Sequence, residues 1–578
     1  MRENTVKNRI IIFVLTIVTV LFMSMGVFGA LFEKKPTAYA ASYSFNSAAD
    51  FVAYSKTYGA ANQYDVISID ITAGYSDLDG FVSLGTSSAP FAGRLTISDP
   101  LSFFNCPLFD YVSTDMTLVG GLTLSRKAAK TGSYDGTSDG ALFANHVVAG
   151  TVPASWSLIL EEADSNQAET FKGVFGDIGA NAEVDLTFTN RMPNGSALNS
   201  MNVSGSGDTG LIAGSIGTGA TLGVTTTAYS GGNITVTSTG GEAGGLVGKM
   251  ASGSTLNLKS ANNSRISSVS ASGSGKYAGG VVGHNDGGTI NVSVASYDIS
   301  ALSVSGNKGA GGVCGYYVNY AASYDLNLNK YAFSSTTQIS ATASDSYAGG
   351  AFGAFINEGS ASTVTVSGNV GVKLDSASRR GGIIGWYNTD DLTNTLKITN
   401  VVSDVWCNGN NTRAGLIGRI DDNSTAYVSI SDVTCTARNT ISAGLIGYVG
   451  TGGNFIDVSG NVTISGNLSG GGGLIDNLSS GVLRLAGVTD ISGVSSVTGQ
   501  IVRARDKSLI YALGNGKDYT PATIDPVTSQ ITTPASGWKL IRRSTSLDVD
   551  DIYGWGQVLR VDGTNLNESD LFTVNSTA

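Results

Sequence analysis

The stretch AGGVVG, from Ala278 to Gly283, returns along most of this chain at regular intervals. The other close copies are AGGLVG at 243–248, AGGVCG at 310–315, AGGAFG at 348–353, GGIIG at 381–385, AGLIG at 414–418 and 443–447, GGGLID at 471–476 and GLIAG at 210–214. Looser forms at Pro107, Ala141 and Gly173 extend the series, so that apolar anchors recur about every 33 residues between positions 108 and 474. A period of this size indicates a solenoid or a repeat array.

The segments between the motif copies have the residue pattern of short strands. In TINVSVASYDISALSVSGNKG, at 289–309, two runs alternate Val, Ile and Ser with other residues, and a break separates them. Alternation with period two predicts strands, and the intervening Gly, Asn, Asp and Ser predict turns. No unit contains a helical pattern, and the units are short for a four-stranded propeller blade. Three short strands per unit, stacked in register, predict an all-β protein with a parallel β-helix.

The glycines of the motif are predicted to be structural, because glycine allows backbone conformations and close approaches that other residues do not. The apolar pair, as in Leu246–Val247 or Ile383–Ile384, cannot point inward at both positions of a regular strand. Either the chain bends between the two residues, or the outer one is covered. The motif glycines are Gly245, Gly248, Gly280, Gly283, Gly312, Gly315, Gly350, Gly353, Gly382, Gly385, Gly415, Gly418, Gly444 and Gly447.

The recurring pattern G-[LVI]-[VI]-G resembles the GLUG motif of bacterial secreted and cell-surface proteins. The resemblance covers about Phe91 to Leu485, with departures at Ala351–Phe352 and at Asp476. It implies a right-handed parallel β-helix, here of about twelve coils, in a secreted or surface-exposed protein. The handedness is implied by the resemblance alone.

The chain divides into four segments. Residues 1–40 are predicted to be a signal peptide, because basic residues precede an apolar run and Ala38-Tyr39-Ala40 matches a cleavage site. An uncleaved membrane anchor is the alternative, and both interpretations place the remainder outside the cytoplasm. Residues 41–89 are predicted to be an N-terminal cap, with Ser47 starting a helix and DVISIDI forming a strand. Residues 90–499 form the β-helix, and 500–578 form a β-rich C-terminal cap or the start of a further module.

Composition excludes several classes of function. The net charge of −11 argues against binding to nucleic acid and against docking on an anionic membrane. Two histidines and four cysteines leave little material for metal sites, so we expect no cofactor and no metal. Cys407 and Cys435 both end S-D-V-x-C segments, which predicts that they occupy the same position in adjacent coils as buried thiols, with a bond between them left open.

A polysaccharide-cleaving enzyme is the main alternative, since parallel β-helices also carry pectin-cleaving sites. The segment Asn388-Thr389-Asp390-Asp391 resembles the acidic cluster of polygalacturonases, and Arg419-Ile420-Asp421-Asp422 resembles their basic signature. Both histidines, His146 and His284, precede these segments, however, and Asn and Asp are the expected residues of turns. Asp421-Asp422-Asn423 lacks the spacing of a calcium loop. We therefore predict no catalytic, cofactor or metal residues.

One set of residues remains as a candidate binding site. The residue after each motif copy would lie in a single column of a stacked solenoid, and several of these residues are aromatic. Aromatic rings on an outer face can stack on sugar rings or bind a partner, whereas the alternative is that they shield a corner of the coil. The column residues are Lys249, His284, Tyr316, Ala354, Trp386, Arg419 and Tyr448, with Tyr317 and Tyr387 beside two of them.

The sequence thus predicts an exported, non-catalytic scaffold or adhesin whose binding face is built by the repeats. Its expected partners are glycans or the surface of a host or neighbouring cell, and insertion into a membrane is not expected after cleavage of the signal peptide. A cleft lined by acidic residues would favour the enzyme instead. A structural spacer in a larger surface protein is the second alternative.

Overall fold

The computed structural model describes residues 40–504, apart from 72–77, 79, 99–100, 103–105, 126–139, 162–169, 192–200, 229–232, 264, 408–411 and 495–499, and beyond 504 only short strands. The segment predicted to be a signal peptide lies outside the described residues, except for Ala40. In the described part of the chain, no helix has the length and apolar character needed to cross a bilayer.

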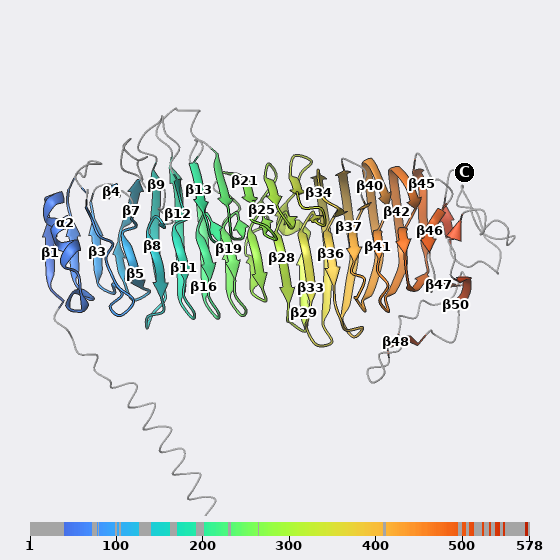
Figure 1. Cartoon of the computed structure of the whole chain (residues 1–578), viewed down its shortest axis with the longest axis horizontal. Helices are drawn as coiled ribbons and strands as arrows, with labels where there is room; N and C mark the ends of the chain where they lie inside the picture. The colour runs from blue at the N-terminus through green and yellow to red at the C-terminus, as the bar shows by residue number, and fades with distance from the viewer. Residues whose placement is uncertain are drawn as a thin grey trace, which may run out of the picture.

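The described residues form a parallel β-helix, which confirms the predicted fold. Strands stack along one long axis, and each pairs in parallel with the equivalent strand of the next coil (Figure 1). One face is a sheet of fourteen strands that follow the motif copies, called here the post-motif sheet. Its strands, in order, are β5 (Phe109–Ser113), β8 (Ala144–Val148), β11 (Phe175–Ile178), β15 (Ala213–Ile216), β19 (Val247–Met250), β23 (Val282–Asp286), β28 (Cys314–Asn319), β33 (Phe352–Asn357), β36 (Ile384–Asn388), β39 (Ile417–Ile420), β41 (Ile446–Val449), β43 (Ile475–Leu478), β46 (Gln500–Ala504) and β51 (Leu547–Asp548).

A sheet of twenty-three strands, called here the large sheet, covers other sides of the coils and contains the first half of each motif copy. Its strands are β10 (Thr170–Phe171), β13 (Met201–Gly205), β14 (Thr209–Gly210), β17 (Ile234–Ser238), β18 (Ala243–Gly244), β21 (Ile266–Ala271), β22 (Tyr277–Gly279), β26 (Ser303–Gly306), β27 (Gly309–Gly311), β29 (Ser323–Asn327), β31 (Gln338–Ala341), β32 (Tyr347–Gly349), β34 (Thr363–Leu374), β35 (Arg379–Gly381), β37 (Thr395–Cys407), β38 (Thr412–Ala414), β40 (Tyr427–Ala443), β42 (Phe455–Gly472), β44 (Gly481–Leu485), β45 (Val488–Val494), β47 (Ser508–Leu513), β50 (Trp538–Arg543) and β52 (Thr573–Asn575).

The remaining elements are smaller. A seven-stranded sheet contains β4 (Leu101–Ser102), β7 (Gly121–Ser125), β9 (Ala154–Glu161), β12 (Glu183–Arg191), β16 (Thr221–Ala228), β20 (Thr255–Leu258) and β24 (Thr289–Val292). A four-stranded sheet contains β1 (Ser42–Phe45), β2 (Val66–Ile69), β3 (Arg94–Ile97) and β6 (Thr117–Val119). Two strand pairs are β25 (Tyr297–Asp298) with β30 (Tyr331–Ala332), and β48 (Thr523–Ile524) with β49 (Ile531–Thr532). The helices are α2 (Ala48–Thr57), η1 (Ala60–Asn62) and η2 (Leu328–Lys330).

The motif forms a corner of the coil, which resolves how two neighbouring apolar residues both reach the core. β18 ends at Gly244 and β19 begins at Val247, so that the chain bends at the residues between them. Leu246 and Val247 are both fully buried. Their backbone N–H groups both donate to the carbonyl oxygen of Val281 in the next coil, at 3.0 and 3.1 Å. Of the two predicted alternatives, a bend between the apolar residues or a covered outer residue, the structure therefore shows the bend.

The N-terminal end of the stack is covered by α2, which lies beside β1 in Figure 1. The helix follows Ser47, the residue predicted to begin it, although the Ser47 side chain makes no capping hydrogen bond. Phe51, Val52 and Tyr54 of this helix are buried, and the Tyr54 hydroxyl donates to Asp65 Oδ2 at 2.7 Å. An apolar helix face therefore covers the first coil, whose cross-section would otherwise be exposed to water.

At the other end, parallel stacking continues past residue 499. β46 pairs in parallel with β43, and β47 pairs in parallel with β44. Pairing then changes direction, since β50 is antiparallel to β47 and β51 is antiparallel to β46. Trp538 begins β50, whereas Trp555 lies outside the described residues.

The prediction that Cys407 and Cys435 occupy one position in adjacent coils is wrong. The register of the large sheet pairs Cys435 with Ser403, and it pairs Cys407 with Leu374. Neither thiol is part of a disulfide, and both are buried. The S-D-V-x-C segments are therefore displaced from each other by four residues, because the coil between them is longer than their separation in the sequence.

Candidate functional site

The residues that follow the motif copies lie in one column on the post-motif sheet. Register pairs link each member to the next, so the column runs through eleven of the fourteen strands, from β5 to β41, with one residue per coil. In order, it contains Tyr111, His146, Asp177, Ser215, Lys249, His284, Tyr316, Ala354, Trp386, Arg419 and Tyr448. Because side chains alternate across a strand, all of these residues point to the same face.

This column faces outward, but its large side chains are only partly exposed. His284, Tyr316, Trp386, Arg419 and Tyr448 are half-buried, and Ala354 is buried. The residue after each of them points inward. The hypothesis that Tyr317 and Tyr387 belong to an outer binding face is therefore wrong.

The two tyrosines lie in the core, where Tyr317 is 3% exposed and Tyr387 is fully buried. Tyr317 stacks on Phe355 of the next coil, with ring centroids 5.2 Å apart, and Phe355 in turn stacks on Tyr387. Alternation along β28 and β36 places them opposite to Tyr316 and Trp386.

Two further tyrosines join the outer column from the strands that precede the motif corner. Tyr277 lies 4.8 Å from Tyr316, measured between ring centroids, and Tyr347 stacks on Trp386 at 5.0 Å with an interplanar angle of 17°. The sequence carries a signal for both, since each directly precedes the alanine of a motif copy. We call the following seven residues the aromatic strip: Tyr277, His284, Tyr316, Tyr347, Trp386, Arg419 and Tyr448.

Ion pairs hold the N-terminal part of the strip. Glu242 accepts a hydrogen bond from the Tyr277 backbone N–H at 2.6 Å, and it lies 3.3 Å from Lys276 Nζ and 3.9 Å from His284 Nδ1. Burial alone would raise the pKa of Glu242, but His284, the Tyr277 N–H and Lys276 together lower that pKa below its ordinary value. His284 also packs on Tyr316 at 4.7 Å. The contacts of Glu242 therefore fix the positions of Tyr277 and His284 in this part of the strip.

Charged groups also flank the C-terminal part of the strip. Lys308 Nζ lies 5.1 Å from the centroid of the Tyr347 ring, on which Trp386 also stacks. The Tyr347 hydroxyl donates to Asp345 Oδ2 at 3.2 Å, and burial, with Asp345 nearby, raises the pKa of Tyr347 to about 12. The hydroxyl therefore stays protonated at neutral pH. Arg419 lies 5.2 Å from the Tyr448 ring centroid in a cation–π contact.

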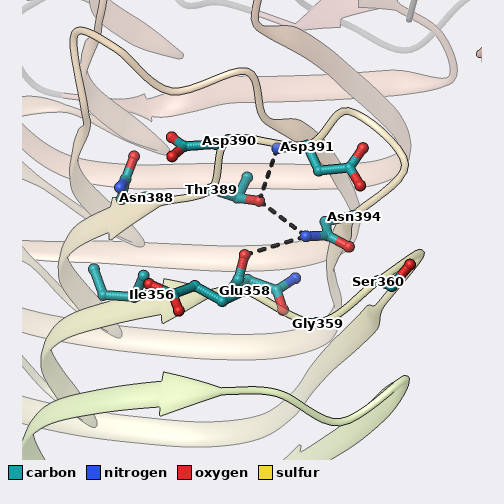
Figure 2. A pocket seen from close by; sticks show the side chains of 10 residues that line it. Ile356, Glu358, Gly359, Ser360, Asn388, Thr389, Asp390, Asp391 and Asn394 are labelled. Atoms are coloured by element: carbon teal, nitrogen blue, oxygen red, sulfur yellow. Dashed lines mark hydrogen bonds between the residues drawn. The ribbon is translucent and has the colours of Figure 1, made fainter.

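A hollow of about 320 Å³ lies on the same outer face, at the turns that follow β33 and β36. Asn388, two residues after Trp386 on β36, lines it, as does Ile356, which is paired with Asn388 in the preceding coil. Two residues of a strand span about 6.6 Å, so the backbone of Trp386 lies that far along β36 from Asn388, although Trp386 itself does not line the hollow. Figure 2 shows the turn residues Thr389, Asp390 and Asp391 on one side of the hollow and Glu358 on the other.

The floor of the hollow is rigid and its rim is acidic. Buried Asn394 donates from Nδ2 to the carbonyl oxygen of Asn357 and to Thr389 Oγ1, both at 3.1 Å (Figure 2). Glu358 and Asp390 are exposed. Asn388 Oδ1 is buried and has no hydrogen-bond partner among the described residues. The hollow therefore offers mainly acceptors, which suit the hydroxyl groups of a sugar.

The residues weighed for catalysis lie in several different places. His284 belongs to the strip, whereas His146 stacks on Tyr111, with ring centroids 4.3 Å apart, and pairs with Asp177. Arg419 forms an ion pair with Asp422 at 2.5 Å and lies 3.3 Å from Asp421, so its segment is a closed turn. Within the described ranges, no three His, Cys, Asp or Glu side chains are grouped so that they could hold a metal ion.

Comparisons of the chain with protein-family models, with curated proteins and with solved structures gave no match.

Proposed function

We propose that this protein is an exported, non-catalytic scaffold of the GLUG-motif type that binds glycans through its post-motif face. The observation that carries the proposal is the position of Trp386, a half-buried tryptophan on the outer face, two residues along β36 from Asn388, which lines the hollow together with Ile356. A sugar ring stacks on an aromatic face while its hydroxyl groups bond to nearby polar groups. Trp386 and the hollow supply both parts.

The size of the hollow supports this function. A volume of about 320 Å³ falls at the lower end of the range of small-ligand sites. Its floor is held by hydrogen bonds between buried side chains, so the site is largely formed before a ligand arrives. Repetition of the coil extends the outer face on both sides of Trp386, which suits a long polysaccharide better than a single small sugar.

A glycan-binding screen of the 41–578 protein, followed by titration of the best ligand, tests the proposal. We expect Trp386→Ala to weaken binding at least tenfold, and Tyr316→Ala to weaken it less. Trp406→Ala is the matched control, because Trp406 is also half-buried, lies on the large sheet and is held by a cation–π contact from Arg438 at 5.4 Å. Unchanged binding by Trp386→Ala, with an unchanged circular dichroism spectrum, would contradict the proposal.

A polysaccharide-cleaving enzyme is the second candidate, and the acidic rim of the hollow favours it. Glu358 and Asp390 lie on opposite turns of the hollow (Figure 2), and glycoside hydrolysis uses two carboxylates on either side of a bond. A reducing-end assay on the bound glycan separates the two functions. If reducing ends appear and Glu358→Gln or Asp390→Asn abolishes them, the protein is an enzyme.

A further inference from the structure

Arg379 occupies a special position at the edge of the aromatic strip. The outer column that precedes the motif corner contains, in register, Tyr277, Gly309, Tyr347, Arg379 and Thr412. Arg379 is the only cation among these five. It neighbours Tyr347 along the stack, and it shares a coil with Trp386, on which Tyr347 stacks. Arg379 therefore lies one coil from Tyr347, on the same strand face as the stacked pair of rings.

Arg379 differs from three other cations near the strip because its charge is not matched by a carboxylate. Those three each have a carboxylate partner: Lys276 with Glu242, Lys308 with Asp345, and Arg419 with Asp421 and Asp422. Arg379 Nη1 donates to the carbonyl oxygen of Ser378 at 3.2 Å, and no carboxylate of the described residues lies within ion-pair distance. Nη2 has no partner among those residues and is left for another acceptor.

The same place has an excess of hydrogen-bond donors. Arg379 Nε, Trp386 Nε1 and Arg419 Nε are buried N–H groups, and none has an acceptor among the residues that the structure describes. Trp386 and Arg419 are register partners in adjacent coils. Buried donors without acceptors are rare, and each makes its surroundings more electropositive. The Arg379 guanidinium group, with its own Nε among these donors, and the N–H groups of Trp386 and Arg419 together favour a negatively charged ligand.

We infer that the glycan bound at Trp386 is anionic, with a carboxylate of the sugar bound by Arg379 while a ring face stacks on Trp386. This inference rests on the proposed function and adds the chemical class of the ligand. The planar guanidinium group presents paired N–H donors that match a carboxylate. The acidic rim of the hollow, with Glu358 and Asp390, repels a carboxylate, so the sugar carboxylate would lie at Arg379 and only hydroxyl groups would enter the hollow.

The test compares acidic oligosaccharides with neutral counterparts of the same length. The probes are uronate and sialylated oligosaccharides, each also prepared with its carboxyl groups reduced to hydroxymethyl groups. We expect the wild-type protein to bind at least one acidic probe about tenfold more tightly than its reduced counterpart. Arg379→Gln should remove that preference, and Arg379→Lys should restore part of it, since lysine keeps the charge but loses the planar donors.

The variants separate this inference from the proposed function. Trp386→Ala should weaken binding of the acidic and the reduced probe alike, whereas Arg379→Gln should weaken binding of the acidic probe only. If the wild-type protein binds acidic and reduced probes with equal affinity, or if Arg379→Gln weakens binding of both probes equally, the inference that the glycan is anionic is wrong. The proposal that the protein binds glycans would not be affected by that result. Failure of every probe to bind would overturn both proposals. Lys397→Gln on the large sheet is the control for a general change of surface charge.

Discussion

Replacing Gly280 by alanine tests whether the motif glycines set the spacing between coils. An ideal β-carbon at this position would lie 2.1 Å from the carbonyl oxygen of Gly312 and 2.6 Å from Cδ2 of Leu302. The leucine side chain can rotate away. The oxygen of Gly312 belongs to the backbone of the next coil, however, and the Gly280 N–H donates to Gly311 in that same coil at 3.0 Å. The methyl group therefore has to push two hydrogen-bonded coils apart.

The loss in the free energy of unfolding can be worked out from these distances. Ordinary contact of a β-carbon begins at 3.4 Å, so the Gly312 oxygen must retreat by about 1 Å from the substituted residue. The hydrogen bond from Gly280 to Gly311 then lengthens to about 4 Å, which is beyond bonding distance. Loss of one such bond costs about 1 kcal/mol. Overpacking of a tight interior adds about 1–3 kcal/mol. We expect Gly280→Ala to lower the free energy of unfolding by about 2–4 kcal/mol.

Urea denaturation followed by far-UV circular dichroism measures this loss. Gly371→Ala is the matched control, because Gly371 lies on the outer side of β34 and its nearest neighbour, the carbonyl oxygen of Asp404, would be 3.9 Å from the new β-carbon. That variant should be neutral or more stable by about 0.5 kcal/mol, since alanine restricts the unfolded chain. Equal denaturation midpoints for Gly280→Ala and Gly371→Ala would refute the reasoning.

Three further predictions concern stability and reactivity. Burial raises the pKa of the Cys407 thiol to about 12, and only Cys106 among the four cysteines is partly exposed, so a thiol reagent should label one cysteine in the folded protein and four after denaturation. Asp457 and Arg484 form a fully buried ion pair at 2.5 Å, and Asp457→Ala should cost about 3–5 kcal/mol of stability, checked by thermal unfolding. Because folding lowers the pKa of Glu242, its stabilisation is complete above the unfolded pKa near 4.3 and is lost as the pH falls through the folded value. A Glu242→Gln variant should lack that part of the acid dependence in unfolding measured between pH 2 and pH 7.

The architecture could be predicted because the inward positions repeat. Register partners of Val282 along the stack are Cys314, Phe352 and Ile384, which differ in shape but are all apolar. An interior that excludes water accepts any of them and rejects an unpaired charge, so the period is visible in the sequence despite the substitutions. That the residues after the motif copies form one column could be predicted for the same reason, because their distance from the anchor is fixed, whereas the sequence leaves open the direction in which the column faces.

Other features could not be predicted, because coils differ in length. Cys407 and Cys435 are 28 residues apart, whereas register at this place joins Ser403 to Cys435, a step of 32. Matching two similar sequence segments, 28 residues apart, therefore predicts the wrong register partner for Cys435. Tyr317 was misplaced for a simpler reason: the motif marks where a strand begins but not which neighbour faces inward. The contact between Tyr347 and Trp386 depends on how the chain turns at the motif corner, which the repeat pattern does not specify.

The pattern of the outer column separates a binding face from a corner shield. Shielding would be needed at every coil, since each one has the same glycine corner. The coils of Asp177 and Ser215 nevertheless place a short polar side chain at this position, and the coil of Ala354 places a methyl group there. The coils of Asp177 and Ser215 therefore form without a ring at this position, whereas Ala354 is itself buried and shares its coil with Tyr347. This pattern favours the proposed binding role over a purely structural one for the aromatic side chains of the other coils. The rings lie next to Arg379 and the hollow, where a ligand would need them, and the argument for shielding would return only if Trp386→Ala unfolded its own coil.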